Sequence, residues 1–238
     1  GSVVELTLVG VPEIRAAAAA TQVAEDFAML HDAWHAWQPG SLGRVNTLLA
    51  SSGRFAAPPA VLPLITRSQT LALQSDNLFN PALGKLFALW GFHKDDPSHN
   101  APPDPAAVAA LLAARPQMQD IVVDGLFLQT ANPAVQLDFG AIAKGYATDL
   151  ALDRLRAQGV QHALINAGGS VKAMGQNGTQ PWRVGIRDPH QAQQALAWLE
   201  VQGTEAVVTS GSYERFFSYQ GQRYSHIIDP RTGQPATG

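Results

Sequence analysis

Residues 137 to 153 read LDFGAIAKGYATDLALD, and they predict a short strand that turns directly into a helix. The strand is expected over residues 135 to 137 and the helix over residues 140 to 158. Small and apolar side chains recur at helical spacing and would form one buried face, namely Ala143, Ala147, Leu150, Ala151 and Leu155. Gly159 stands where glycine commonly ends a helix.

Asp138 and Lys144 are the candidate chemical groups of this stretch. Asp138 stands at the predicted strand end, where a carboxylate would meet a ligand, and Lys144 lies one turn into the predicted helix. Unpaired amides in the first turn of a helix favour an anion, and a lysine there can reach a phosphate. The alternative is an ordinary helix cap followed by a surface lysine, which is common where Asp-x-Gly precedes a helix.

The rest of the chain mixes helices and strands without strict alternation. Helices are expected over residues 12 to 37, 62 to 75, 81 to 90 and 105 to 115. Strands are expected over residues 4 to 8, 163 to 165, 171 to 174, 182 to 186, 196 to 201, 206 to 209 and 224 to 228, with a hairpin around Asp124-Gly125. This order favours an α+β fold of mixed and antiparallel sheets packed with helices over a doubly wound α/β sheet.

The composition describes a globular chain and limits its partners. The 238 residues suit one large domain or two small ones, with 46% hydrophobic and 15% charged residues. The net charge is −3 and no basic tract alternates with aromatic residues, so nucleic acid is not expected as a partner. No apolar run approaches the roughly 20 residues of a membrane span. There is no cysteine, which excludes disulfides and thiolate metal sites.

Two C-terminal clusters carry further candidate groups. Thr209 and Ser210 place two hydroxyls at a predicted strand end, where they could donate to phosphate oxygens, although a hydroxyl-rich turn is the simpler explanation of them alone. His226 and Ile228 share one face of the predicted last strand. His226 could accept a proton from a hydroxyl near neutral pH, while a lone histidine on a strand is more often structural.

Taken in order, these motifs resemble one family. Residues 137 to 147 are similar to the central motif of the bacterial FAD:protein FMN transferases, formerly called thiamine-biosynthesis lipoproteins. The later blocks follow in the family's order, namely NAGG at 166–169, PWRVGIRDP at 181–189, TSG at 209–211 and HIIDPRTG at 226–233. Residues 37–46 and NLFNP at 77–81 resemble two earlier blocks, so the resemblance spans nearly the whole chain.

The resemblance implies a T-fold-like flavin transferase architecture and a specific reaction. The family takes FAD as substrate, cuts its diphosphate with the help of Mg²⁺, and places FMN on a threonine or serine of an acceptor flavoprotein subunit or domain, so that AMP leaves. His226 would be the general base, and the carbonyl of Ala141 a magnesium ligand. Flavin-nucleotide contacts would come from Trp37, Asn77, Leu78, Phe79, Asp138, Lys144, Thr209, Ser210 and Ile228.

The chain departs from the family pattern in two ways. Asn80 stands where an aspartate is usual, and the sequence stops at residue 238, before the segment in which the family usually carries its other metal ligands. Residues 1–238 are therefore expected to be a single flavin transferase domain without that segment. One carbonyl cannot hold magnesium, which needs near-octahedral oxygen ligation. Two alternatives stay open: an FAD-binding or storage module without turnover, and a hydrolase that gives FMN and AMP.

The resemblance also bears on location. It implies the bacterial periplasm or the outer face of the inner membrane, with a lipid anchor that would have been lost together with a targeting segment before Gly1-Ser2. The cytoplasm is the alternative.

Overall fold

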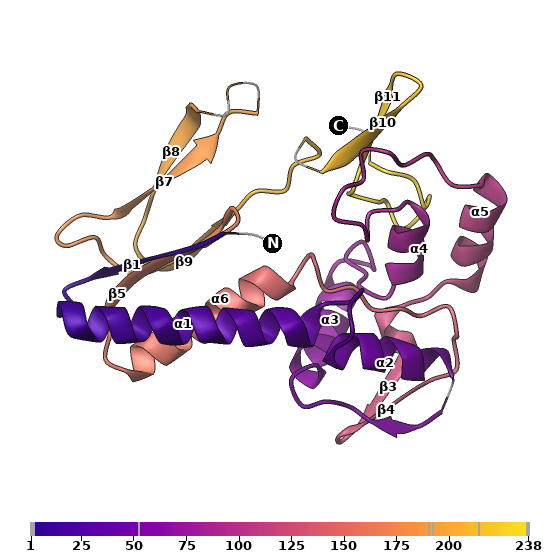
Figure 1. Ribbon diagram of the computed structural model, residues 1–238, viewed down its shortest axis with the longest axis horizontal. Coiled ribbons are helices and arrows are strands. Elements are labelled where there is room, and N and C mark those ends of the chain that lie inside the picture. The colour runs from indigo at the N-terminus through magenta and orange to yellow at the C-terminus, as the bar shows by residue number, and fades with distance from the viewer. Residues whose placement is uncertain (1–2, 52, 190, 192, 214, 237–238) are drawn as a thin grey trace. The chain divides into compact units, whose positions relative to one another are not determined.

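The computed structural model describes residues 3–51, 53–189, 191, 193–213 and 215–236, and the chain forms two compact units (Figure 1). The first unit comprises Gly1–Leu30 and Ala143–Ser210, and the second comprises His31–Ile142 and Gly211–Gly238. Each unit has its own sheets and its own apolar core. No helix in the described ranges is long and apolar enough to cross a membrane.

A four-stranded antiparallel sheet forms the centre of the first unit. Its strands are β1 (Val4–Val9), β5 (His162–Ala167), β6 (Ser170–Gly175) and β9 (Gly203–Val208), in the order β1-β5-β6-β9. Leu6 pairs with Ile165, and Ile165 pairs with Lys172. Because side chains alternate between the faces of a strand, this register gives the sheet two distinct faces to cover.

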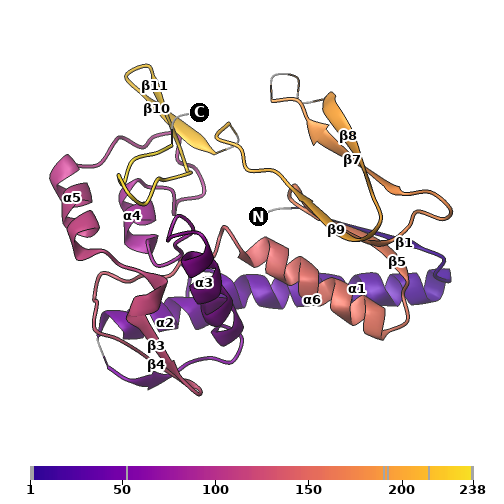
Figure 2. The same cartoon turned by 180° about the vertical axis from the view of Figure 1, so that it is seen from behind.

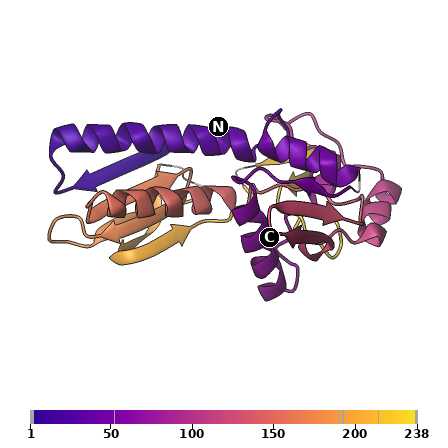
Figure 3. The same ribbon diagram turned by 90° about the horizontal axis from the view of Figure 1, so that it is seen from below.

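Two helices cover one face of this sheet and a ribbon covers the other. Helices α1 (Glu13–Trp34) and α6 (Ala143–Ala157) lie on the same face (Figures 1 and 2), and α6 is seen in front of the strands in Figure 3. The buried residues between helices and sheet are Ala19, Val23, Ala151, Leu152, Leu155, Val160, Ala163, Ile165 and Met174. The ribbon of β7 (Trp182–Arg187) and β8 (Ala195–Val201) packs Trp182, Val184 and Val201 against Ala173 of the other face.

The second unit consists of short helices around small sheets. Its helices are α2 (Ser41–Ala50), α3 (Leu62–Gln74), α4 (Gly84–Leu89), α5 (Pro105–Ala114) and the 3₁₀ helix η1 (Met118–Asp120). Its strands are β2 (Phe55–Ala56), β3 (Ile121–Asp124) and β4 (Phe127–Thr130), in the order β2-β4-β3, and the hairpin of β10 (Phe216–Tyr219) and β11 (Gln222–Ser225). Trp90, Phe92 and Phe217 are buried together with Leu86 and Val108.

The α+β prediction is confirmed, and several local predictions are wrong. Helix α1 ends at Trp34 instead of residue 37, and α4 begins at Gly84 instead of residue 81. The expected strand over residues 135–137 is a single bridge between Gln136 and Leu83, because the Asn46 side chain takes up the hydrogen bonds of the next residue. The helix begins at Ala143 instead of Gly140, since the Asp138 carboxylate binds the Gly140 amide in a local turn that competes with helix. The last strand ends at Ser225, because Ser225 pairs with Phe216, the first residue of its four-residue partner β10. Helix α2 was not predicted.

The DPRTG turn at residues 229–233 docks on α5, and Gly233 is the residue that permits it. Gly233 has a φ of +68°, and a Cβ at this position would lie 2.7 Å from Val108 Cγ1. Its carbonyl also accepts a hydrogen bond from Trp90 Nε1 at 2.8 Å. We expect Gly233→Ala to lower the free energy of unfolding by about 2–4 kcal/mol, from left-handed strain plus overpacking, as measured by urea unfolding.

Gly221→Ala is the matched control for this substitution. Gly221 has a φ of +80°, but no atom lies within 4 Å of its added Cβ. It should therefore lose only about 1 kcal/mol from backbone strain. Equal losses in the two variants would show that the packing of the turn against α5 contributes nothing.

Candidate functional site

Hydrogen bonds fix the backbone at Asp138 from two directions. The N–H of Asp138 donates to the carbonyl of Pro81 at 2.9 Å. The preceding residue, Leu137, is buried; the Asn46 side-chain amide donates to its carbonyl at 2.9 Å and accepts from its N–H at 2.7 Å. Asn46 thus takes the place of a neighbouring strand and satisfies both polar groups of a buried residue.

The carboxylate of Asp138 accepts one hydrogen bond on each oxygen. Oδ2 accepts from Trp37 Nε1 at 2.8 Å, and Oδ1 accepts from the Gly140 N–H at 2.7 Å. Since a carboxylate has about four lone-pair sites, each oxygen can accept again. This side chain suits a hydroxyl or amine donor of a nucleotide, whereas its charge would repel a phosphate.

Residues 77–79 lie only a few residues before Pro81, which hydrogen-bonds to Asp138. They lead into Pro81, whose carbonyl accepts from Asp138. Asn77 has a φ of +60°, and its Oδ1 is buried without a hydrogen-bond partner among the described residues. Leu78 exposes 53% of its surface, and Phe79 is half-buried. A positive φ and an unsatisfied buried acceptor are both uncommon, and both occur more often at ligand-binding positions than elsewhere.

His226 lies one residue beyond β11 and makes two hydrogen bonds to one carbonyl. Its backbone N–H and its Nδ1 each lie 3.0 Å from the oxygen of Arg215. Because a carbonyl oxygen can only accept, Nδ1 must carry the proton, and Nε2 is then the basic nitrogen of the neutral ring. This is the tautomer that a general base acting through Nε2 requires.

The neighbouring residues Phe92 and His93 connect His226 to Trp37. The rings of the buried Phe92 and of His226 form a T-shaped pair, with centroids 6.4 Å apart. The His93 ring lies 5.3 Å from the Trp37 ring, and Trp37 donates to Asp138. The structure therefore brings Trp37, Asp138 and His226 around one segment of the second unit. Ile228 packs against the same aromatic core.

The carbonyl of Ala141 is of the right chemical type for magnesium but does not complete a site. Ala141 is exposed in the turn that the Ile142 N–H closes on the Phe139 carbonyl. Within the described ranges, no group of three or more His, Asp or Glu side chains could hold a metal ion. Magnesium requires about six oxygen ligands, so these residues supply at most part of its coordination.

Lys144, Thr209 and Ser210 belong to the first unit. Lys144 is exposed and is the second residue of α6, so it lies in the first turn and not one turn further along. Thr209 and Ser210 are exposed and directly follow the end of β9. Their expected contacts with the flavin nucleotide stay predictions.

The DPRTG motif serves the fold. The Asp229 carboxylate accepts hydrogen bonds from the Arg231 backbone N–H at 2.9 Å and from its guanidinium at 2.7 Å. The side-chain hydrogen bonds from Arg231 lower the pKa of Asp229 to about 2. The Gly233 N–H also donates to the Asp229 carbonyl at 2.8 Å. The motif is therefore a closed turn whose acidic group is already satisfied within the turn.

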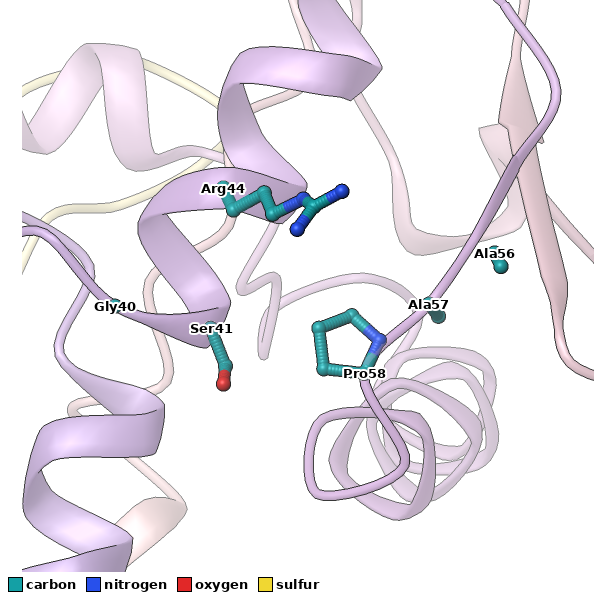
Figure 4. Close-up of a pocket in the computed structure, with 6 residues that line it drawn as sticks. All are labelled: Gly40, Ser41, Arg44, Ala56, Ala57 and Pro58. Atoms are coloured by element: carbon teal, nitrogen blue, oxygen red, sulfur yellow. The ribbon is translucent and has the colours of Figure 1, made fainter.

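Two hollows of the second unit are lined by residues other than the predicted site residues. One, of about 490 Å³, is lined by Gly40, Ser41, Arg44, Ala56, Ala57 and Pro58 (Figure 4). The Arg44 side chain extends from α2 toward Ala56 and Ala57. The other, of about 210 Å³, lies beside His93, Lys94 and Trp90. No residue of the predicted site lines either hollow.

Sequence reasoning assigned no role to Asn46, Phe92, His93 or Arg215. A buried asparagine between Leu42, Val45 and Leu49 on an apolar helix face would have been a signal for Asn46. Nothing local marks Arg215, because its partners lie more than 120 residues away in the sequence.

Comparison with known proteins supports the resemblance. The model of the ApbE family matches residues 1–238. A FAD:protein FMN transferase of Rhodobacter capsulatus is 43% identical over 238 residues, which is 100% of this chain and 45% of that protein. One from Treponema pallidum is 37% identical over 211 residues, which is 80% of this chain and 58% of that protein. The chain spans about half the length of the curated relatives it matches.

Solved structures share the fold. The ApbE protein of Thermotoga maritima matches with a TM-score of 0.87 and 26% identity, over 100% of this chain and 79% of that one. The apo form of the Pseudomonas stutzeri flavinyl transferase ApbE matches with a TM-score of 0.78 and 31% identity, over 99% of this chain and 77% of that one. With a family match over its full length and these relatives, the chain belongs to the ApbE family.

Proposed function

We propose that the protein transfers FMN from FAD to a threonine or serine hydroxyl of an acceptor protein and releases AMP. The observation that carries this proposal is the 3.0 Å contact between His226 Nδ1 and the Arg215 carbonyl, because an Nδ1–H that donates to this carbonyl leaves Nε2 as the proton acceptor of the neutral ring. The names of the relatives, FAD:protein FMN transferase, agree with this chemistry.

The proposed step balances as a single phosphoryl substitution. The acceptor hydroxyl oxygen bonds to the phosphorus of the FMN half of FAD, and the bond from that phosphorus to the bridging oxygen breaks. AMP leaves with the bridging oxygen and the bonding electron pair. His226 Nε2 accepts the hydroxyl proton, which makes the oxygen a better nucleophile as the new bond forms.

Asp138 and Trp37 are proposed to hold the nucleotide in place. The Asp138 carboxylate, with its remaining lone pairs, would accept from a ribose hydroxyl or an exocyclic amine, and the Trp37 ring offers an apolar surface to the flavin. Asn77, Leu78 and Phe79 would line the adenine side, and Ile228 would contact the ligand from the aromatic core. Lys144, Thr209 and Ser210 are of the chemical type that binds phosphate oxygens.

Magnesium belongs to the proposal as the ion that neutralises the charge of the diphosphate. From this chain, the Ala141 carbonyl would bind it. The acceptor is proposed to be a flavoprotein subunit or domain with an exposed threonine or serine. We place the reaction in the bacterial periplasm or at the outer face of the inner membrane.

A transfer assay tests the proposal. The protein is mixed with FAD, magnesium and an acceptor that carries a Ser/Thr-Gly-Ala-Thr-like site. The control reaction uses the same acceptor with its target threonine or serine replaced by valine or alanine. Flavin fluorescence should stay with the unaltered acceptor in a denaturing gel, and AMP should appear in equal amount. FAD binding without AMP would indicate a storage module, and AMP without any acceptor would indicate a hydrolase; either result contradicts the transferase.

Asp138→Ala should weaken FAD binding by about 10- to 100-fold. The loss of a hydrogen bond to a charged group costs about 1.5–3 kcal/mol, and 1.4 kcal/mol corresponds to a factor of ten. Fluorescence titration with FAD measures the affinity. Asp124→Ala is the control, because this exposed carboxylate of the same unit pairs only with Arg54 among the contacts described. Equal FAD affinity in the two variants would show that Asp138 does not contribute to FAD binding.

A further inference from the structure

Arg215 ties two distant segments of the second unit together. Its Nη2 donates to the carbonyl of Phe92 at 2.5 Å and to the carbonyl of Lys94 at 2.8 Å. The guanidinium also lies 5.9 Å from the centre of the Phe87 ring. Because one nitrogen makes both hydrogen bonds, the side chain acts as a clamp on residues 92–94.

The backbone carbonyl of Arg215 hydrogen-bonds to His226 and so selects the tautomer of its ring. The Arg215 carbonyl accepts from both the N–H and the Nδ1 of His226, each at 3.0 Å. This pair of residues stands just outside the β10–β11 hairpin, beyond the pairing of Phe216 with Ser225. The ends of a hairpin fray, since they have hydrogen bonds on one side only. A clamp on Arg215 would keep this terminal pair closed.

Packing around the clamp points in the same direction. Phe92 is fully buried, and its ring pairs both with Phe217 on β10 and, in a T-shaped arrangement, with His226. The residue whose carbonyl Arg215 holds is therefore also the residue against which His226 packs. Loss of the clamp would loosen the carbonyl that binds Nδ1 and the ring that supports the imidazole.

We propose that Arg215 is a positioning residue for His226, which it holds in the Nδ1–H tautomer with Nε2 directed at the substrate. The inference rests on the proposed role of His226 as the base. Arg215 itself acts through its carbonyl and through Phe92, and contributes no group to the reacting atoms. The tautomer is a property of the protein alone, so it can be measured whether or not transfer occurs.

The test compares Arg215→Met with Arg215→Lys. Methionine fills similar space without a donor, whereas lysine keeps a positively charged donor on a slightly shorter side chain. Arg223→Met is the control, because the Arg223 guanidinium lies over the Phe216 ring of the same hairpin and is exposed. Arg215→Gln is a second variant, in case the methionine variant does not fold.

Nitrogen-15 NMR of the imidazoles is the deciding measurement, with the His226 signals assigned by their loss in His226→Asn. We expect Nδ1 to be protonated in the wild type, in Arg215→Lys and in Arg223→Met, and both tautomers to be populated in Arg215→Met and Arg215→Gln. The kcat for transfer should fall by about 10- to 100-fold in these last two, with the KM for FAD little changed.

An unchanged Nδ1–H tautomer in Arg215→Met and Arg215→Gln overturns the inference, whatever the activity. A changed tautomer together with a wild-type kcat would support the positioning of His226 by Arg215. It would also show that His226 is not the base of the proposed reaction. The two failures are thus distinguishable.

Discussion

His226→Asn is expected to lower the kcat for flavin transfer by about 100- to 10,000-fold while FAD still binds. Loss of a positioned base removes this much of the rate. Asparagine is the sharper choice than alanine, because its amide nitrogen lies where Nδ1 lies and can keep the hydrogen bond to the Arg215 carbonyl. Only the proton-accepting Nε2 is then lost. Initial rates of acceptor labelling and FAD titrations measure the two quantities.

His31→Asn is the control for this variant, since His31 is exposed on α1 and has no assigned role. It should keep both the rate and the affinity. If His226→Asn and Asp138→Ala lose FAD binding to the same degree, His226 is a binding residue and the base must be sought elsewhere.

Asn46→Leu is expected to destabilise the second unit by about 2–5 kcal/mol. The N–H and carbonyl of Leu137 are buried and bind only the Asn46 side chain in the described contacts. Each would be left unsatisfied at a cost of about 1–3 kcal/mol. The shift in the urea midpoint measures the loss. The FAD affinity should fall as well, because the next residue is Asp138.

Thr47→Ala is the matched control on the same helix. Thr47 is exposed, and its hydroxyl bonds only to the Gly43 carbonyl one turn earlier. Its removal should change stability by less than about 0.5 kcal/mol. If Asn46→Leu were equally harmless, the segment before Asp138 would not depend on this asparagine.

Local patterns in the sequence predicted the parts of the fold that local patterns control. The existence of helix α1, although not its end, and the Asp124-Gly125 turn between β3 and β4 are confirmed. The onset of α6 was misplaced because a hydrogen bond from Gly140 to the Asp138 side chain competes with the helix. The end of β11 was misplaced because strand length depends on the partner strand.

The candidate site could be predicted only in part, because contacts between residues far apart in the sequence hold it together. The family pattern pointed to Trp37, Asp138 and His226, and the structure places them around residues 92–93. What holds them there is set by contacts between distant residues. Asn46 reaches Leu137 across 91 residues, and Arg215 reaches Phe92 across 123. Hydrophobic periodicity carries no information on such pairs.

A crystal structure of the protein soaked with FAD is the most direct measurement of where the ligand is held. We predict that the Asp138 carboxylate accepts a hydrogen bond from the nucleotide, and that the diphosphate lies on the Nε2 side of the His226 ring. If the bound FAD contacted neither Asp138 nor His226, the proposed binding site and the proposed base would both be wrong.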